Sequence, residues 1–219
     1  MLAAMAALCV FAMLLARAVA ARNLVYPLTV GGSVGFVATA AAGGAHRHAY
    51  GRFMITGLVA CGVGDLVGPY HFAAGAIAFL LAHLAFIAAC FAQGIHKRRV
   101  LCASPAAVFA AVLLAAWLLP HVSGPEVWLV VAYLLVITAM LVAAYGANLT
   151  AGRGLLTSGA VLFYLSDIFL ARWRYVSPNG IHAFFCYPLY YAACILLALS
   201  ISSVTMANER KTNAYSNQL

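Results

Sequence analysis

The chain has 219 residues, of which 66% are hydrophobic and 7% are charged, and its mean hydropathy is +1.02. About a quarter of the residues of a soluble domain are charged, so this composition excludes a soluble protein and predicts a helical, polytopic membrane protein. The formal charge of +8 does not indicate nucleic-acid binding, because the basic residues lie in short loops between apolar runs, where they set topology and meet membrane lipids.

Eight apolar runs predict eight transmembrane helices in a single domain over residues 1–207, followed by a polar tail over residues 208–219. The first run resembles a signal peptide in its small residues, but no basic residue precedes it and seven more runs follow, so we interpret it as a helix. In chain order, the predicted spans cover residues 1–19, 24–42, 53–68, 71–92, 103–119, 127–147, 155–171 and 181–204.

The basic residues are distributed unequally between the two sides of this topology. Eight lie on the side of the termini: Arg47, Arg52, Lys97, Arg98, Arg99, Arg153, Arg210 and Lys211. Four lie on the other side: Arg17, Arg22, Arg172 and Arg174. The positive-inside rule therefore predicts cytoplasmic termini, although Arg17 and Arg22, directly after the first helix, favour the reverse. The alanine-rich composition favours a bacterial inner membrane.

Two aspartates stand out because the whole chain has only four acidic residues: Asp65, Glu126, Asp167 and Glu209. Glu126 lies in a loop and Glu209 in the polar tail, whereas Asp65 and Asp167 lie inside apolar runs. An aspartate near the centre of a membrane helix costs roughly 2.5–3.5 kcal/mol on insertion scales. Two such residues in a chain this poor in acids indicate a function, although a structural pairing with a hydroxyl on a neighbouring helix is the alternative.

Both aspartates lie near the C-terminal end of an odd-numbered span, so they are expected at similar depth near the same membrane face. They are separated by four spans, and each follows a small residue, Gly64 or Ser166. Spans three and four could thus correspond to spans seven and eight in a parallel four-plus-four repeat, as in some membrane proteins.

Other polar side chains could join the aspartates. His83 lies mid-span and shares a helix face with Phe79 and Phe86. Its alternative role is a structural hydrogen bond within the bundle. The remaining candidates for substrate binding are Ser166, Arg172, Arg174, Tyr187, Tyr190 and Tyr191. The tyrosines could equally pack in the core, and the two arginines, beside Trp173 and Tyr175, could equally anchor the chain at the interface.

The six cysteines are scattered through mostly apolar stretches without a CxxC pair or a His/Cys ligand spacing. We interpret them as small buried hydrophobic residues, so neither a disulfide framework nor a metal site is predicted.

The sequence around the aspartates resembles the YhhN-type lysoplasmalogenases. The likeness is carried by GAVLFYLSDIFLARWRY (residues 159–175) with YYAACILLAL (190–199), and by the Gly64-Asp65 pair followed by Gly-x-x-x-Phe-x-x-x-His up to His83. Cys194 stands where family members usually have glutamine. The resemblance implies eight membrane spans and hydrolysis of the vinyl ether bond of a lysoplasmalogen, which releases a fatty aldehyde and a glycerophosphocholine or glycerophosphoethanolamine.

The two aspartates suit that chemistry. Vinyl ethers are cleaved by protonation of the β-carbon followed by attack of water, which requires one protonated carboxyl and one carboxylate. Which of Asp65 and Asp167 is the acid stays open, with His83 orienting or sharing the proton and Arg172 and Arg174 near the headgroup. No cofactor is required.

Two other classes of function remain compatible with the sequence. Intramembrane carboxylates and a histidine are also the parts of a proton-coupled transporter. A lipid-binding membrane protein without catalytic activity is the third possibility.

Overall fold

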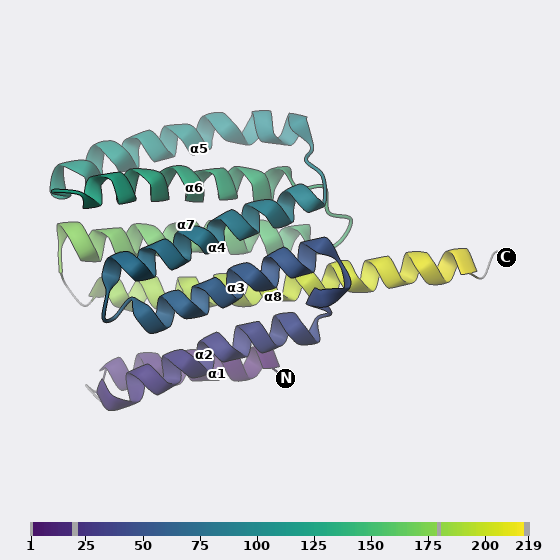
Figure 1. Ribbon diagram of the computed structural model, residues 1–219, viewed down its shortest axis with the longest axis horizontal. Helices are drawn as coiled ribbons and strands as arrows, with labels where there is room; N and C mark the ends of the chain where they lie inside the picture. Colours follow the sequence, from purple (N-terminus) through teal and green to yellow (C-terminus); the bar gives the residue numbers. More distant parts are fainter. Residues whose placement is uncertain (1, 19–21, 179–180, 217–219) are drawn as a thin grey trace.

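The computed structural model describes residues 2–18, 22–178 and 181–216, which form an antiparallel bundle of helices (Figure 1). None of these residues forms a strand. The α-helices are α1 (Leu2–Ala18), α2 (Arg22–Ala42), α3 (Ala49–Val67), α4 (Phe72–Ala92), α5 (Lys97–Leu118), α6 (Glu126–Gly146), α7 (Arg153–Ala171) and α8 (Ile181–Ser216). Shorter turns of helix are η1 (Ala45–Arg47), η2 (Leu119–His121) and the π-helical η3 (Arg172–Val176), which continues α7.

Seven of the described helices, α2 to α8, are long and apolar enough to cross a membrane. The prediction of an all-α, polytopic membrane protein is therefore confirmed. The count of eight spans is not confirmed, because the described α1 has 17 residues, slightly fewer than the roughly 20 that a span needs. The side chains of Arg17 and Arg22, used above for orientation, lie outside the described residues.

Some helices extend well beyond the apolar runs. α5 begins at Lys97, so the basic residues 97–99, predicted as a loop, form its first turn. Residues 208–216, predicted as a polar tail, continue α8 without a break. Hydropathy marks only the part of a helix inside the hydrocarbon, whereas lysine and arginine are good helix formers and extend the helix into the headgroup region.

Successive helices run in opposite directions, so α3 and α7 end at the same end of the bundle (Figure 1). α3 packs most extensively against α4, and α7 against α8. α5 lies at the edge, where only 6% of its most apolar stretch is buried. The paired packing is what the predicted four-plus-four repeat would produce, but the repeat itself remains a prediction.

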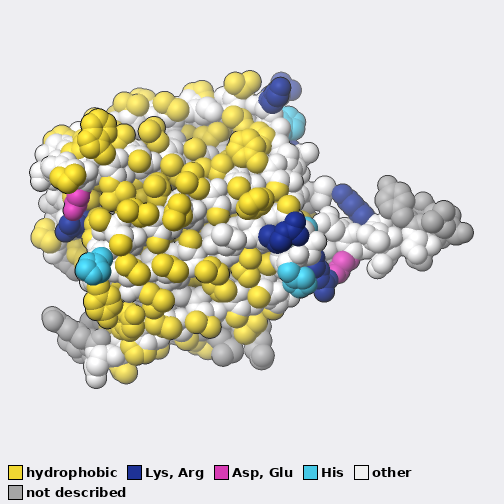
Figure 2. Space-filling model, in the orientation of Figure 1, with side chains coloured by type: hydrophobic (Ala, Val, Ile, Leu, Met, Phe, Trp, Pro, Cys, Tyr) yellow, Lys and Arg dark blue, Asp and Glu magenta, His cyan; other side chains and the backbone are white. Residues whose placement is uncertain are grey.

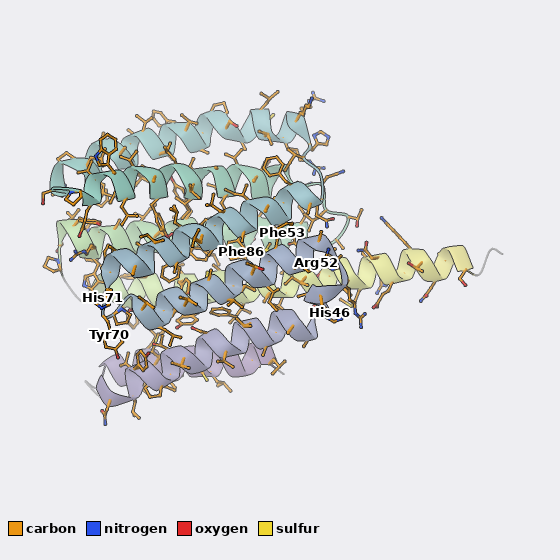
Figure 3. The ribbon with its side chains drawn as sticks, viewed as in Figure 1. His46, Arg52, Phe53, Tyr70, His71 and Phe86 are labelled. Atoms are coloured by element: carbon orange, nitrogen blue, oxygen red, sulfur yellow. The ribbon has the colours of Figure 1, made fainter. Side chains whose placement is uncertain are left out.

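The charged side chains lie at the two ends of the bundle, and most of the basic ones lie at one of them. Lysine and arginine side chains gather at the end from which the α8 extension projects (Figure 2). There Arg47 forms an ion pair with Glu209, and His48 caps α3 by accepting a hydrogen bond from the Gly51 amide at 2.9 Å. Figure 3 marks this end by His46 and Arg52, and the opposite end by Tyr70 and His71.

The α3–α4 connection brings two helices into backbone contact beside Asp65. Gly68 and Pro69 lie in the turn that joins α3 to α4. A Cβ atom added to Gly75 would lie 2.6 Å from the Gly68 Cα atom, closer than non-bonded atoms approach. Small residues thus allow the tight crossing that holds the Asp65 end of α3 in place.

Candidate active site

A cavity of about 800 Å³ lies at the end of the bundle where α3 and α7 terminate. Its lining comes from α2 to α8 and is mostly apolar. Tyr70, one of the lining residues, marks this end of the molecule in Figure 3. The polar side chains of the lining are Tyr26, Thr29, Asp65, Tyr70, Tyr133, Tyr164, Ser166, Asp167, Arg174, Tyr175, Tyr187 and Tyr190.

One oxygen of the Asp65 carboxyl accepts hydrogen bonds from two hydroxyl groups. Ser33 on α2 donates to Oδ2 at 2.6 Å, and Tyr190 on α8 donates to the same atom at 2.8 Å. Asp65 is only 8% exposed, so these bonds replace the water that a carboxylate would otherwise bind. Two donated hydrogen bonds favour the ionised form of this group.

The Asp167 carboxyl has one hydroxyl donor and one imidazole neighbour. Tyr133 on α6 donates to Oδ2 at 3.0 Å. His83 on α4, fully buried, holds its Nε2 atom 3.7 Å from the same oxygen. The Asp167 side chain is 14% exposed and lines the cavity, whereas His83 lies behind it.

The hydrogen-bond partner of His83 fixes which ring nitrogen carries the proton. Nδ1 lies 2.6 Å from the carbonyl oxygen of Phe79, which can only accept, so Nδ1 must donate. In the neutral ring Nε2 is then a lone pair, and it has no hydrogen-bond partner among the described residues. That lone pair faces Asp167, so a proton on Asp167 could be shared with His83.

The two carboxyls are neighbours in one site. Both line the same cavity. A single ring separates their partners: the Phe163 centroid lies 4.6 Å from that of His83 and 5.4 Å from that of Tyr190. The arrangement provides two differently solvated carboxyls beside one apolar space.

The structure sorts the other predicted residues. Ser166 and Tyr187 line the cavity with Tyr190, and Ser166 donates to the Phe163 carbonyl at 2.8 Å. Tyr191 does not line it; its hydroxyl donates to the Thr29 carbonyl at 3.3 Å.

The two predicted headgroup arginines also differ. Arg174 lines the cavity mouth and pairs with Glu126 at 3.1 Å. Arg172 points elsewhere, with its Nε atom 3.3 Å from Nε2 of His182.

Three residues that contact the site groups are absent from the sequence-based prediction: Ser33, Tyr133 and Glu126. Ser33 and Tyr133 are hydroxyl residues in the middle of apolar spans, and that position is itself a signal. Glu126 was set aside because it lies in a loop, and only the folded chain brings it to Arg174. Each of the three contacts lies between helices or turns that are distant in sequence, so local patterns could not assign them.

A comparison with known protein families identifies the chain. The model of the YhhN family matches residues 22–201, which include every residue of the site described above. The chain belongs to the YhhN family. No curated protein and no solved structure matches it. This YhhN protein thus has the family that its aspartate motifs resemble, and the family supports a membrane hydrolase.

Within residues 2–18, 22–178 and 181–216, no group of three or more His, Cys, Asp or Glu side chains could hold a metal ion. Independently of that, a pair of carboxyls with a histidine behind one of them has the groups needed to hold and transfer a proton.

Proposed function

We propose that this YhhN protein is a membrane hydrolase that cleaves the vinyl ether bond of lysoplasmalogens. The observation that carries the proposal is the pair of carboxyls lining one apolar cavity, with two hydroxyl donors on Asp65 and a lone-pair acceptor beside Asp167. Family membership supports the class of reaction.

The hydrogen bonds favour a division of roles between the two aspartates. Asp65 is the carboxylate, because two hydroxyls donate to it. Asp167 is the acid, because the Nε2 lone pair of His83 can accept its proton and hold it ready. His83 is a positioning residue, since it contacts Asp167 and does not line the cavity.

The reaction then balances without a cofactor. Asp167 gives its proton to the β-carbon of the vinyl ether, which produces an oxocarbenium ion that the Asp65 carboxylate stabilises. Water attacks the carbon next to the ether oxygen and loses a proton to Asp65, giving a hemiacetal. As the hemiacetal collapses, Asp65 returns its proton to the leaving glycerol oxygen, and Asp167 takes the hydroxyl proton. Both carboxyls regain their starting states.

The cavity suggests how the substrate lies. Its apolar lining would take the alkenyl chain, and Arg174 at the mouth would face the phosphate. Arg172 has no place in this arrangement, because it is not among the lining residues. Ser166, Tyr187 and Tyr190 would contact the substrate from α7 and α8.

The decisive experiment is hydrolysis in heavy water by the purified full-length protein. Lysoplasmalogen should release an aldehyde with one deuterium at its second carbon, because the proton added there comes from an acid that exchanges with solvent. The double variant Asp65→Asn/Asp167→Asn should release none, whereas Glu209→Gln, a carboxyl at the opposite end of the bundle, should keep the activity. Aldehyde release by the double variant would rule out the proposed site.

A second candidate is a proton-coupled transporter, because the buried pair of His83 and Asp167 could also carry a proton across the membrane. Uptake of a solute into proteoliposomes driven by a pH gradient, with no aldehyde released, would favour it over the hydrolase.

We further propose that both termini face the cytoplasm and that the cavity mouth faces the opposite side, as the clustering of basic residues beside the α8 extension favours. In a bacterial inner membrane, a cysteine introduced at Asn213 should resist membrane-impermeant thiol reagents in intact cells. Labelling there would reverse the orientation.

A further inference from the structure

The mouth of the cavity holds a cation in an aromatic cage. The guanidinium carbon of Arg174 lies 4.6 Å from the ring centroid of Phe72 and 5.6 Å from that of Tyr175. The two rings meet edge to face at 6.0 Å, and the Arg174 Nη2 atom donates to Glu126 at 3.1 Å. Three separate elements, the starts of α4 and α6 and the η3 turn, therefore converge on one positive charge.

Two ring faces and a carboxylate attract any organic cation of suitable size, whether or not it belongs to the chain. We propose that Glu126, Phe72 and Tyr175 form a cation subsite that Arg174 fills in this structure and that the amine of a lysophospholipid headgroup takes over when substrate binds. Arg174 then turns to the phosphate of the same headgroup. The inference rests on the proposed function, because it supposes that the cavity takes a lysophospholipid.

The exchange replaces a weak contact by stronger ones. The side chains of Arg174 and Glu126 are 43% and 33% exposed, and ion pairs reached by water contribute little. Arginine binds phosphate through two parallel hydrogen bonds, which are charge-assisted and stronger. Because the amine and the phosphate of such a headgroup are linked by two carbons, both halves of the exchange occur within one mouth.

A second observation points to a polar ligand at the same place. The hydroxyl of Tyr175 is buried and has no hydrogen-bond partner among the described residues. A buried hydroxyl without a partner is unusual, because it loses its hydrogen bond to water. A phosphate drawn in by Arg174 would give this hydroxyl an acceptor.

The test measures binding without turnover. The probes are two saturated ethers, 1-O-hexadecylglycero-3-phosphocholine and the matching 3,3-dimethylbutyl phosphodiester, which lack the vinyl bond and differ only in that a neutral carbon replaces the charged nitrogen. Trp117 and Trp173 line the cavity and supply a fluorescence signal in the full-length protein. The wild type should prefer the phosphocholine, and Glu126→Gln or Phe72→Leu should reduce that preference roughly five- to tenfold.

Two further variants separate the two halves of the exchange. Arg174→Gln should weaken the binding of both probes, because it removes the phosphate partner. Glu209→Gln breaks the corresponding ion pair with Arg47 at the opposite end, and should leave both affinities unchanged.

Equal affinity of the wild type for the two probes would overturn the subsite. So would an equal loss for both probes in Glu126→Gln and Phe72→Leu. These outcomes do not depend on hydrolysis: a protein that releases no aldehyde but prefers phosphocholine through Glu126 would retain the subsite and lose the proposed reaction.

Discussion

Asp65 and Asp167 occupy corresponding positions near the cavity ends of α3 and α7, and a comparison of their surroundings explains how they can differ chemically. Each accepts a hydrogen bond from a hydroxyl on the preceding helix, that of Ser33 on α2 or of Tyr133 on α6. Each also faces a ring from α8 or α4, in the other half of the chain. For Asp65 that ring is Tyr190, which donates, whereas for Asp167 it is His83, which presents a lone pair.

The difference between the two rings shows how one neighbouring side chain can make one of two similar carboxyls the acid and the other the carboxylate. A phenol beside a carboxyl stabilises its anion, and an unprotonated imidazole nitrogen holds its proton. The two aspartates have similar surroundings, each with a hydroxyl from the preceding helix and a ring from the other half of the chain. The predicted repeat would produce this similarity. The following predictions test where the likeness ends.

The largest effect is expected from the carboxyls themselves. Asp167→Asn should lower the rate of aldehyde release by about 10³-fold or more, and Asp65→Asn by about 10²-fold, within the range of general acid–base catalysis. The acid has the greater effect because protonation of the carbon is the step that starts the reaction. A coupled assay of aldehyde release under saturating substrate measures both rates, and a larger loss for Asp65→Asn would reverse the assigned roles.

Removal of the rings should have the next largest effect. Tyr190→Phe should lower the rate roughly tenfold, since a hydrogen bond to a charged group contributes about 1.5–3 kcal/mol. His83→Phe, which removes the nitrogen 3.7 Å from the Asp167 carboxyl, should lower it roughly 30-fold, within the range of general acid–base catalysis. His83→Phe should leave the affinity for the saturated ether probes unchanged, because His83 does not line the cavity. If both variants keep the wild-type rate, the partners do not divide the roles.

The two helix pairs should also respond differently to added methyl groups. Gly75→Ala places a Cβ atom against the Gly68 backbone and should destabilise the protein by about 1–3 kcal/mol. Gly159→Ala, between α7 and α8, meets Cγ and Cδ2 of Leu197 at 3.0 Å and the Ala193 carbonyl oxygen at 3.3 Å, which is less close than the Gly75 contact, and should cost about 1 kcal/mol. Thermal unfolding in detergent measures both, and equal losses would show that the α3–α4 crossing is no tighter than its counterpart.

The smallest effect is the pH dependence of stability, and it concerns only α3, the helix that carries Asp65. Burial, and then the positive charge of Arg52, lower the pKa of His48 from its ordinary 6.5. The unfolded chain therefore takes up this proton at higher pH than the folded protein, so the stability contributed by the His48 cap is complete above about pH 6.5 and declines as the pH falls below it.

The midpoint of thermal unfolding should thus fall by roughly 1–3 °C between pH 7.5 and pH 5.5 through this group. His48→Asn, which can still cap α3, should lack that part of the decline. α7, which carries Asp167, begins after Gly152 without a side-chain cap and offers no such group. If the unfolding midpoint of His48→Asn falls by the same amount between these pH values, the decline comes from a group other than His48.

The sequence was sufficient for the framework of the site. Aspartates are so costly inside a membrane that their position alone predicted a shared depth and face, and the structure brings both to one cavity. His83 could be added because helical spacing sets the face on which it lies. These inferences were possible from sequence because each depends on one helix or on the alternating direction of helices, and the roles of the three residues remain predictions.

The remaining parts of the site depend on how the helices pack. Ser33 and Tyr133 reach the aspartates only because α2 lies beside α3 and α6 beside α7. Arg172 and Arg174 are indistinguishable in the sequence, yet the turn of η3 directs one to Glu126 and the other to His182. Side-chain direction at the end of a helix is set by contacts that no local pattern contains.

The unbroken length of α8 has a mechanical consequence. Its 36 residues extend over about 54 Å, well beyond the roughly 30 Å of the hydrocarbon core. The projecting part belongs to the same helix as Tyr190, and its Glu209 pairs with Arg47 beside the bundle. A load on this projection would therefore enter the bundle through the helix that presents its phenol to Asp65.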